Sequence, residues 1–212
     1  MNNLKKFSTE ADYSAATLNY PAVSWVVSGD TVHFDKTAPV VNNKVKIAFT
    51  TDACGAEKSF DVLDPSYITE TLAILNGITV NGEPFTPSGS DAKIYLAANT
   101  DYLIEYELKD DTTNVEGYFS QGPIGGCSSL WFKYDILFPA QVNGITYLND
   151  QGVNNLILES ETPPARSFAS DELNITAIYV PDSAVNSYKN GYWSPWANII
   201  YPISEYSGDI PV

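Results

Sequence analysis

Histidine is almost absent from this chain, and its one copy, His33, lies in a stretch that alternates like a β-strand. Imidazole is the commonest general base and a frequent zinc ligand, so a single histidine argues against Ser/His/Asp or Cys/His catalysis and against zinc. A phosphate-binding loop is also missing, because GPIGG at 122–126 is not followed by a lysine and a helix. We therefore predict no enzyme activity, no cofactor and no metal. Paired carboxylates such as Glu159 and Glu161 leave a glycosidase as a third hypothesis, since such pairs meet only in the fold.

Cysteine is nearly as scarce, with Cys54 and Cys127 far apart in different sequence contexts. Two unclustered cysteines in a chain of this size indicate free, partly buried thiols, with a disulfide between them as the alternative. The acidic run at 110–114 lacks the spacing and the loop glycine of an EF-hand, so we do not predict a calcium site there.

Basic residues are few: 11 Lys and Arg stand against 26 Asp and Glu, a formal net charge of −15. Such a field repels phosphate backbones and excludes nucleic-acid binding as a main role. The acidity favours solubility, with a cation site or a basic partner as the alternative. No stretch approaches the roughly 18 apolar residues of a membrane span. Residues 1–16 carry two lysines without an apolar run behind them, so we expect no secretory signal peptide.

Hydrophobic residues make up 44% of the chain and aromatic residues 13%, which indicates a folded, mainly β protein. Three segments can be separated, at 1–38, 39–112 and 113–212. In the first, Ser8 or Thr9 could cap a short helix. Alternation in Val23–Val27 and Thr31–Asp35 around a Ser-Gly-Asp turn predicts a hairpin.

The second segment is typical of a small β-sandwich, because short alternating runs follow one another between turn residues. The expected strands are KVKIAFT, KSFDVL, GITVNGEPFT, AKIYLAA and DYLIEYELKD. Asn81-Gly82 is the strongest two-residue hairpin turn of the chain. Residues 66–76 predict one or two helical turns.

The third segment indicates a short solenoid with a closing cap. Strand-like runs LWFKYDILF, ITYL and NLILES alternate with Gly, Asn and Pro, and a helix is expected at Ser183–Lys189. An aromatic set lies close by: Tyr188, Tyr192, Trp193, Trp196 and Tyr201. It closes the end of a stacked core, as terminal repeats must, or it forms a platform for sugar or a partner protein.

The sequence GCSSL at 126–130, followed by a strand and Pro139, resembles a BspA-type leucine-rich repeat. ITAIYVPDSAVNSYK with W-x-x-W-A-x-x-I-x-P-I resembles the C-terminal cap of that family. The usual AF before GC is replaced by Gly-Pro-Ile-Gly, and few repeats are present, which argues against a long ligand-binding solenoid. Residues 78–112 are similar to the Ig-like modules that precede such repeats, and residues 5–35 resemble the N-terminal segment of structural proteins of crAss-like and other Bacteroides phages.

The resemblance implies a non-enzymatic virion protein, made in the host cytoplasm and attached outside a tailed-phage capsid as a head fibre or decoration subunit. It implies a short N-terminal anchor, an Ig-like β-sandwich and a degenerate leucine-rich-repeat solenoid with a small helical cap. The expected partners are other virion proteins, further copies of the chain and a host glycan, with no nucleic acid and no membrane. The alternative is a bacterial surface adhesion or carbohydrate-binding module.

Eight residues are the candidates for contacts. The assembly contact is expected at Trp25, Val27, Val32 and Phe34. Partner or glycan contacts are expected at Tyr188, Tyr192, Trp193 and Trp196. Aromatic side chains of this kind are the usual anchors of protein interfaces.

Overall fold

The chain forms two compact units, Met1–Asn42 and Asn43–Val212. The computed structural model describes residues 3–7, 22–28, 31–35, 42–54, 58–89, 91–115, 119, 124–125, 131–146, 148, 152–167 and 175–210. The protein is mainly β, as the sequence predicts, with 40% strand and 17% helix. The predicted boundary at 38/39 lies close to the division between the units.

The first unit contains a three-stranded sheet of order β1-β2-β3. Its strands are β1 (Asn3–Phe7), β2 (Ala22–Ser28) and β3 (Thr31–Asp35). The predicted hairpin is confirmed, because β2 and β3 pair antiparallel across residues 29–30, and His33 is a strand residue. Strand β1 pairs parallel to β2 and was not expected, since two adjacent lysines interrupt its alternation. The helix predicted after Ser8 or Thr9 lies outside the described residues.

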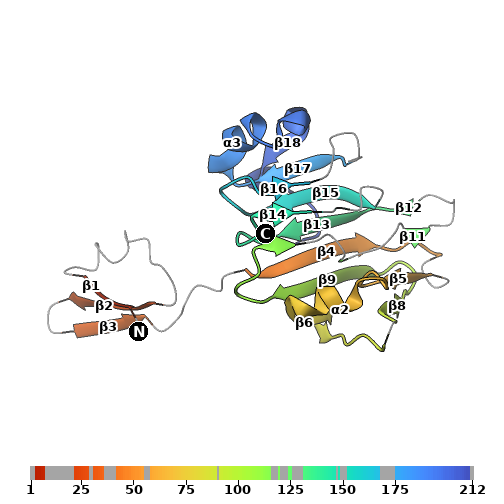
Figure 1. Cartoon of the computed structure of the whole chain (residues 1–212), viewed down its shortest axis with the longest axis horizontal. Helices are drawn as coiled ribbons and strands as arrows, with labels where there is room; N and C mark the ends of the chain where they lie inside the picture. The colour runs from red at the N-terminus through yellow and green to blue at the C-terminus, as the bar shows by residue number, and fades with distance from the viewer. Residues whose placement is uncertain are drawn as a thin grey trace. The chain divides into compact units, whose positions relative to one another are not determined.

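The second unit is built on one sheet of eight strands, in the order β18-β17-β15-β13-β4-β9-β6-β7. The half of the sheet that ends at β7 contains β4 (Lys44–Thr50), β9 (Asp101–Leu108), β6 (Leu75–Val80) and β7 (Glu83–Pro84). The other half contains β13 (Tyr134–Phe138), β15 (Val153–Leu158), β17 (Ala177–Val180) and β18 (Ile200–Pro202). The first half pairs antiparallel and the second pairs parallel, with β4 and β13 joining the halves (Figure 1).

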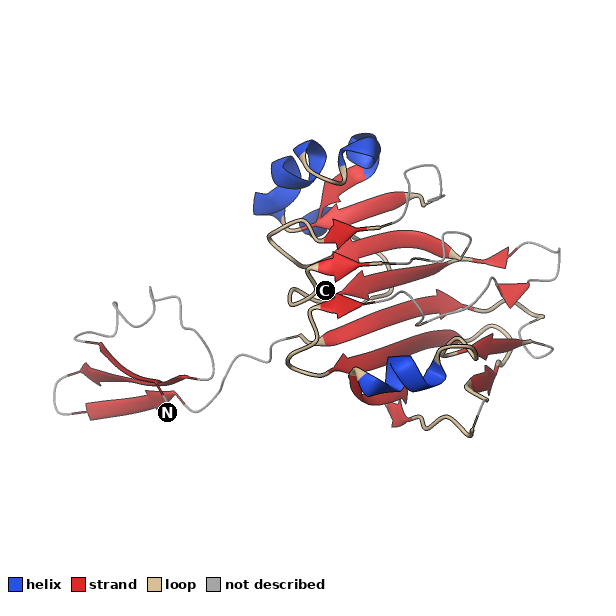
Figure 2. Cartoon of the chain, in the orientation of Figure 1, coloured by secondary structure: helices blue, strands red, loops and turns tan. Residues whose placement is uncertain are grey.

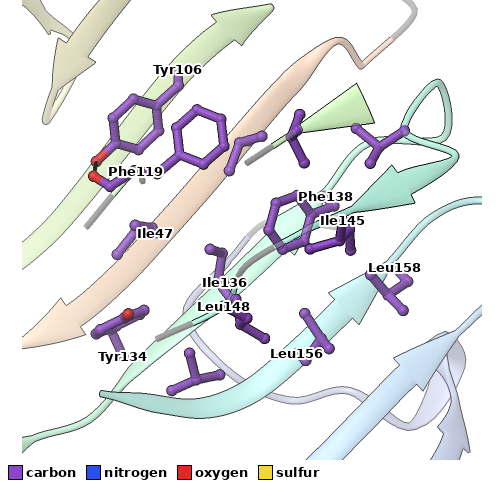
Figure 3. Packing of buried hydrophobic residues seen from close by; sticks show 14 of the residues in the cluster. Ile47, Tyr106, Phe119, Tyr134, Ile136, Phe138, Ile145, Leu148, Leu156 and Leu158 are labelled. Carbon is purple, nitrogen blue, oxygen red and sulfur yellow. Dashed lines mark hydrogen bonds between the residues drawn. The ribbon is translucent and has the colours of Figure 1, made fainter. Parts of the chain in front are cut away.

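A row of aliphatic residues crosses this sheet at successive register positions. Its members are Ile104, Ile47, Ile136, Leu156, Ile178 and Ile200. Each is at most 2% exposed, so the row forms the spine of the core. Figure 3 shows three of its members, Ile47, Ile136 and Leu156. The spine depends on register, because a slip of one residue would turn a whole strand's apolar set to the other face.

Helices and short strands form a second layer over the spine (Figure 2). They are α2 (Ile68–Ala73), the pair β5 (Ser59–Asp61) and β8 (Lys93–Tyr95), and the parallel sheet β10 (Asn114–Val115), β14 (Gly144–Ile145) and β16 (Ala165–Arg166). The cap follows β17 as η3 (Asp182–Ala184), α3 (Val185–Asn190) and η4 (Ser194–Ile199), and η5 (Ile203–Glu205) follows β18. A further pair is β11 (Ile124–Gly125) and β12 (Trp131–Phe132).

One continuous core runs through the second unit, from Val45 near its start to Ile200 near its end. The boundary predicted at 112/113 therefore falls inside this unit. The physical reason is the antiparallel pairing of β4 with β13, which places a strand of the second predicted segment beside a strand of the third. The segment predicted to form a sandwich and the segment predicted to form a solenoid thus contribute strands to a single sheet.

Both edge strands of the eight-stranded sheet contain a proline, Pro84 in β7 and Pro202 in β18. Proline has no main-chain N–H, so it removes a donor that an added strand would need. Short edge strands with proline are a known protection against edge-to-edge pairing. The edges of the main sheet are therefore poor templates for the addition of another strand.

Cys54 is disulfide-bonded, so the expectation of free thiols is wrong. The only other cysteine of the sequence, Cys127, lies outside the described residues. Distance along the chain misled the prediction, because Ala48 near the end of β4 pairs with Asp135 near the start of β13. The sequence leaving β4 contains Cys54, and the sequence leading into β13 contains Cys127.

We expect Gly82→Ala to lower the free energy of unfolding by about 1 kcal/mol, the cost of a left-handed backbone for a residue with a Cβ. Asn81 and Gly82 have φ of 50° and 82°, as the predicted hairpin turn requires. A Cβ at Gly82 would meet no atom within 4 Å, so backbone conformation alone should act. Urea unfolding measures the change. The matched control is Gly77→Ala, which is equally unobstructed without positive φ and should change stability by less than about 0.5 kcal/mol.

Candidate functional site

Three of the four predicted partner-contact residues are core residues. Tyr188 and Trp193 are fully buried, and Trp196 is 6% exposed. Only Tyr192 of the four reaches solvent, with 69% of its surface exposed. The prediction that Tyr188, Trp193 and Trp196 contact a glycan or partner is not compatible with this burial. Their positions fit the alternative, a plug that closes the stacked core.

The plug is held by hydrogen bonds as well as by packing. The hydroxyl of Tyr188 donates to the Ser160 carbonyl at 2.8 Å, and the indole N–H of Trp193 donates to the Pro164 carbonyl at 3.0 Å. The Trp193 ring lies 6.3 Å from the ring of Tyr188 and 5.6 Å from that of Trp196, between centroids. Buried polar groups of aromatic residues need such partners, so these rings are fixed by the sequence that precedes the cap.

Arg166 joins the plug to the surface. Its guanidinium carbon lies 4.4 Å from the centroid of the Trp196 ring, and its Nε donates to the Tyr192 carbonyl at 2.8 Å. Burial lowers the pKa of Arg166 from its ordinary value, yet arginine keeps its charge near neutral pH. The cation–π contact and the hydrogen bond together fix the loop that presents Tyr192 to solvent.

The four predicted assembly residues lie at paired positions of the N-terminal hairpin. Trp25 is opposite Phe34, and Val27 is opposite Val32. Since successive strand residues alternate between faces, these positions share one face of the hairpin. What this face contacts remains a prediction.

A group of three tyrosines, here called the tyrosine cluster, lies on the face of the main sheet opposite the spine. Its members are Tyr179, Tyr201 and Tyr206. The Tyr179 ring is 6.0 Å from Tyr201 and 5.1 Å from Tyr206, and Tyr201 is 38% exposed. Burial raises the pKa of Tyr179, and Asp135 adds to the rise. The cluster therefore places aromatic ring surface on this face of the sheet.

Sequence reasoning included Tyr201 in the aromatic set but missed the other two members of the tyrosine cluster. The alternation in AIYV could have placed Tyr179 outside, because Ile178 and Val180 are fully buried on the opposite face. Nothing in the sequence indicated Tyr206, since its position depends on the chain turning back after β18.

Asp135 lies beside the tyrosine cluster and is only 9% exposed. Its carboxylate accepts hydrogen bonds from the Tyr206 hydroxyl at 2.7 Å and from the Asn155 side-chain amide at 3.0 and 3.1 Å. It also accepts from the Asn155 main-chain N–H and the Asn154 side-chain amide, both at 3.2 Å. A nearly buried carboxylate that accepts this many hydrogen bonds fixes the positions of Tyr206, Asn154 and Asn155 around it.

Residues 111–114 of the acidic segment line part of a depression of about 400 Å³ together with Ala73, Ile74 and Lys109. The Lys109 ammonium donates to the Ala73 carbonyl there, so the depression is lined by a positive charge as well as by an acidic residue. Across the described ranges, no group of three or more His, Cys, Asp or Glu could hold a metal ion.

We expect Asp61→Asn to stabilise the protein at pH 7 by about 0.5 kcal/mol, the scale of a partly exposed charge. Burial raises the pKa of Asp61; Lys93 opposes the rise, and Asp91 and Asp64 add to it. Oδ1 of Asp61 is buried without a hydrogen bond, and its distance to the Lys93 ammonium is 3.8 Å. A raised carboxyl pKa destabilises the fold as pH rises above about 4, where the group ionises. The gain should therefore appear at pH 7 and vanish near pH 3.5.

Urea unfolding of the wild type and Asp61→Asn at both pH values measures this effect. Asp110→Asn is the control, because it removes the same charge from an exposed position. Equal gains from both variants would show that net charge alone acts, and a gain from Asp61→Asn that persists at pH 3.5 would contradict the burial argument.

No helix in the described part of the chain is both long and apolar enough to cross a membrane. Comparison with protein-family models, curated proteins and solved structures found no match for the chain. The resemblances noted from its sequence motifs remain hypotheses.

Proposed function

We propose that this chain is a non-enzymatic structural protein on the outside of a tailed-phage particle, a head fibre or decoration subunit. One observation carries the proposal: the chain has a small β unit, residues 1–42, and a separate larger body. The predicted assembly residues occupy paired positions of the hairpin in the small unit. Such a division suits one part that attaches to a shell and another that is displayed.

The structure of the larger unit favours a subunit displayed on the particle over one that polymerises into a filament by strand addition. Its main sheet has an antiparallel half and a parallel half, and prolines lie in both edge strands. We assign the antiparallel half to an Ig-like module and the parallel half to a degenerate leucine-rich repeat with a helical cap. Parallel strands that recur about every 20 residues, with a small second parallel sheet beside them, favour this assignment.

The disulfide at Cys54 supports a role outside the reducing cytosol. Disulfides persist in oxidising surroundings, which include virion and cell surfaces. A subunit made in the host cytoplasm would form this bond after particle release. Many copies on a symmetric shell would then turn weak contacts of single subunits into strong ones.

Mass spectrometry of purified particles tests the proposal, and should find the chain at a fixed ratio to the capsid protein. Trp25→Ala combined with Phe34→Ala should reduce incorporation at least tenfold, because aromatic anchors dominate interface energies. Tyr95→Ala, at an 85% exposed position of the body, is the control and should leave incorporation unchanged. A chain that is abundant in infected-cell lysate and absent from purified particles would refute the proposal.

The second candidate is a bacterial surface adhesion or carbohydrate-binding module. The tyrosine cluster and exposed Tyr192 favour it, because aromatic rings stack on the apolar faces of sugars, and the disulfide fits an exported protein equally well. A glycan array with the full chain tests it. Binding that is lost in Tyr201→Ala and kept in Tyr67→Ala would favour adhesion over a purely structural role.

A further inference from the structure

The last described residues, 203–210, fold back across the main sheet and are called the C-terminal segment below. They run from the cap to the middle of the sheet, where Ile210 packs against residues of β4, β13 and β15. Ile210 is 2% exposed and belongs to a small apolar cluster with Ala48, Leu137 and Ile157. This cluster is separate from the spine. The C-terminal segment therefore covers an apolar patch on the face opposite the main core.

A polar clamp holds the C-terminal segment at its centre. The Tyr206 hydroxyl donates to Oδ2 of Asp135 at 2.7 Å and accepts from the Ile210 N–H at 3.2 Å. Burial raises the pKa of Tyr206 well above its ordinary value, and Asp135 acts in the same direction, so the hydroxyl stays a donor at physiological pH. Asn155 fixes the carboxylate from the other side. The acceptor is thus organised by the sheet and does not depend on the segment.

Gly208 is required for the close approach of the two partners in the clamp. A Cβ at this position would lie 2.5 Å from Oδ2 of Asp135 and closer still to the Tyr206 hydroxyl, distances that real Cβ atoms do not show. Residues 206–210 therefore form a recognition pattern of tyrosine, glycine and isoleucine at alternate positions. The sheet supplies the matching carboxylate and apolar patch.

Side chains dominate the attachment of the C-terminal segment. In the described structure, the main chain of 204–210 makes no hydrogen bond to a strand of the main sheet. The Ser204 N–H donates to the Asp182 carboxylate in the cap at 3.2 Å, and Ser204 lowers the pKa of Asp182. A segment held mainly by side-chain contacts can leave its site and rebind without unfolding the sheet. Every copy of the chain carries both the segment and its site, which is the requirement for exchange between copies.

We propose that the face formed by β4, β13, β15 and β17 is a docking site for the C-terminal segment of a second copy of this chain. The segment of the same chain is its resting occupant. Exchange links neighbouring copies where their local concentration is high. The inference rests on the proposed function only for that high local concentration on a particle. The docking chemistry itself is carried by Asp135, Tyr206, Gly208 and Ile210.

The first experiment uses a chain that ends at Glu205 and a fluorescent peptide of residues 203–212. Fluorescence anisotropy should show saturable binding of the peptide. Tyr206→Phe or Gly208→Ala in the peptide, or Asp135→Asn in the shortened chain, should weaken it at least tenfold, the effect of losing a hydrogen bond to a charged group. Ser207→Ala is the matched control, since Ser207 is exposed, and should bind like the wild type. A shortened chain that melts cooperatively and does not bind the peptide overturns the docking site.

The second experiment tests whether the segment of a second copy occupies the docking site. It uses full-length chains, so it applies even if the shortened chain does not fold. Light scattering over a concentration series up to several hundred micromolar should show dimers that Gly208→Ala abolishes and Ser207→Ala retains. A full-length chain that remains monomeric overturns exchange between copies, and so does an oligomer that survives both Gly208→Ala and Tyr206→Phe. Absence of the chain from virions would refute the proposed function and leave both of these results unchanged.

Discussion

Replacing Trp193 by alanine should lower the free energy of unfolding by about 4 kcal/mol, within the range for removing a buried tryptophan from a core. Trp193 is fully buried, and its neighbours Tyr188 and Trp196 pack around it. The substitution would also leave the Pro164 carbonyl without the indole N–H that now donates to it. Unsatisfied buried acceptors add to the cost of the cavity.

Urea unfolding followed by tryptophan fluorescence and by far-UV circular dichroism measures this change. Tyr192→Ala is the control, because it removes an adjacent aromatic ring that is 69% exposed, and we expect a change below about 0.5 kcal/mol. If the two variants lost similar amounts of stability, the cap would not be a closed core. Phe in place of Trp193 should recover part of the loss by refilling the cavity without restoring the hydrogen bond.

Loss of the disulfide should cost about 4 kcal/mol, because a cross-link closing a loop of several tens of residues restricts the unfolded chain by roughly that amount. Cys54 follows β4, and its N–H donates to the Asp52 carboxylate at 2.8 Å. We expect Cys54→Ser and reduction of the wild type by dithiothreitol to lower the urea midpoint equally.

Reductant should leave the stability of Cys54→Ser unchanged, which separates the disulfide from general effects of thiol reagents. A wild type whose unfolding is the same with and without reductant would contradict the structural assignment. It would also remove the argument that the protein works outside a reducing compartment.

Local signals in the sequence were good guides to local structure. KVKIAFT alternates and is β4, Asn81-Gly82 is the turn between β6 and β7, and the helix expected at Ser183–Lys189 is present as η3 and α3. These elements depend on neighbours a few residues away: side-chain alternation, positive φ at the turn, and a proline before the helix. Such information is contained in any short window of the chain.

Contacts between distant segments were beyond the reach of the same reasoning. Pairing of β4 with β13 merged two predicted segments into one sheet. From the sequence, Trp193 fits a binding platform as well as a plug of the core. Its burial depends on how the cap closes over the parallel strands.

By itself the sequence determined that this protein is mainly β, acidic and poor in histidine and cysteine, and it located most strands and turns. Only the tertiary structure decided which aromatic residues are buried, that Cys54 is disulfide-bonded, and that Asp135 and Tyr206 meet. The reason is physical: strand and turn formation are set by residues close in the chain, whereas burial and cross-linking depend on the pairing of segments far apart. Many pairings satisfy the same local pattern, and only the packing of the whole chain selects one.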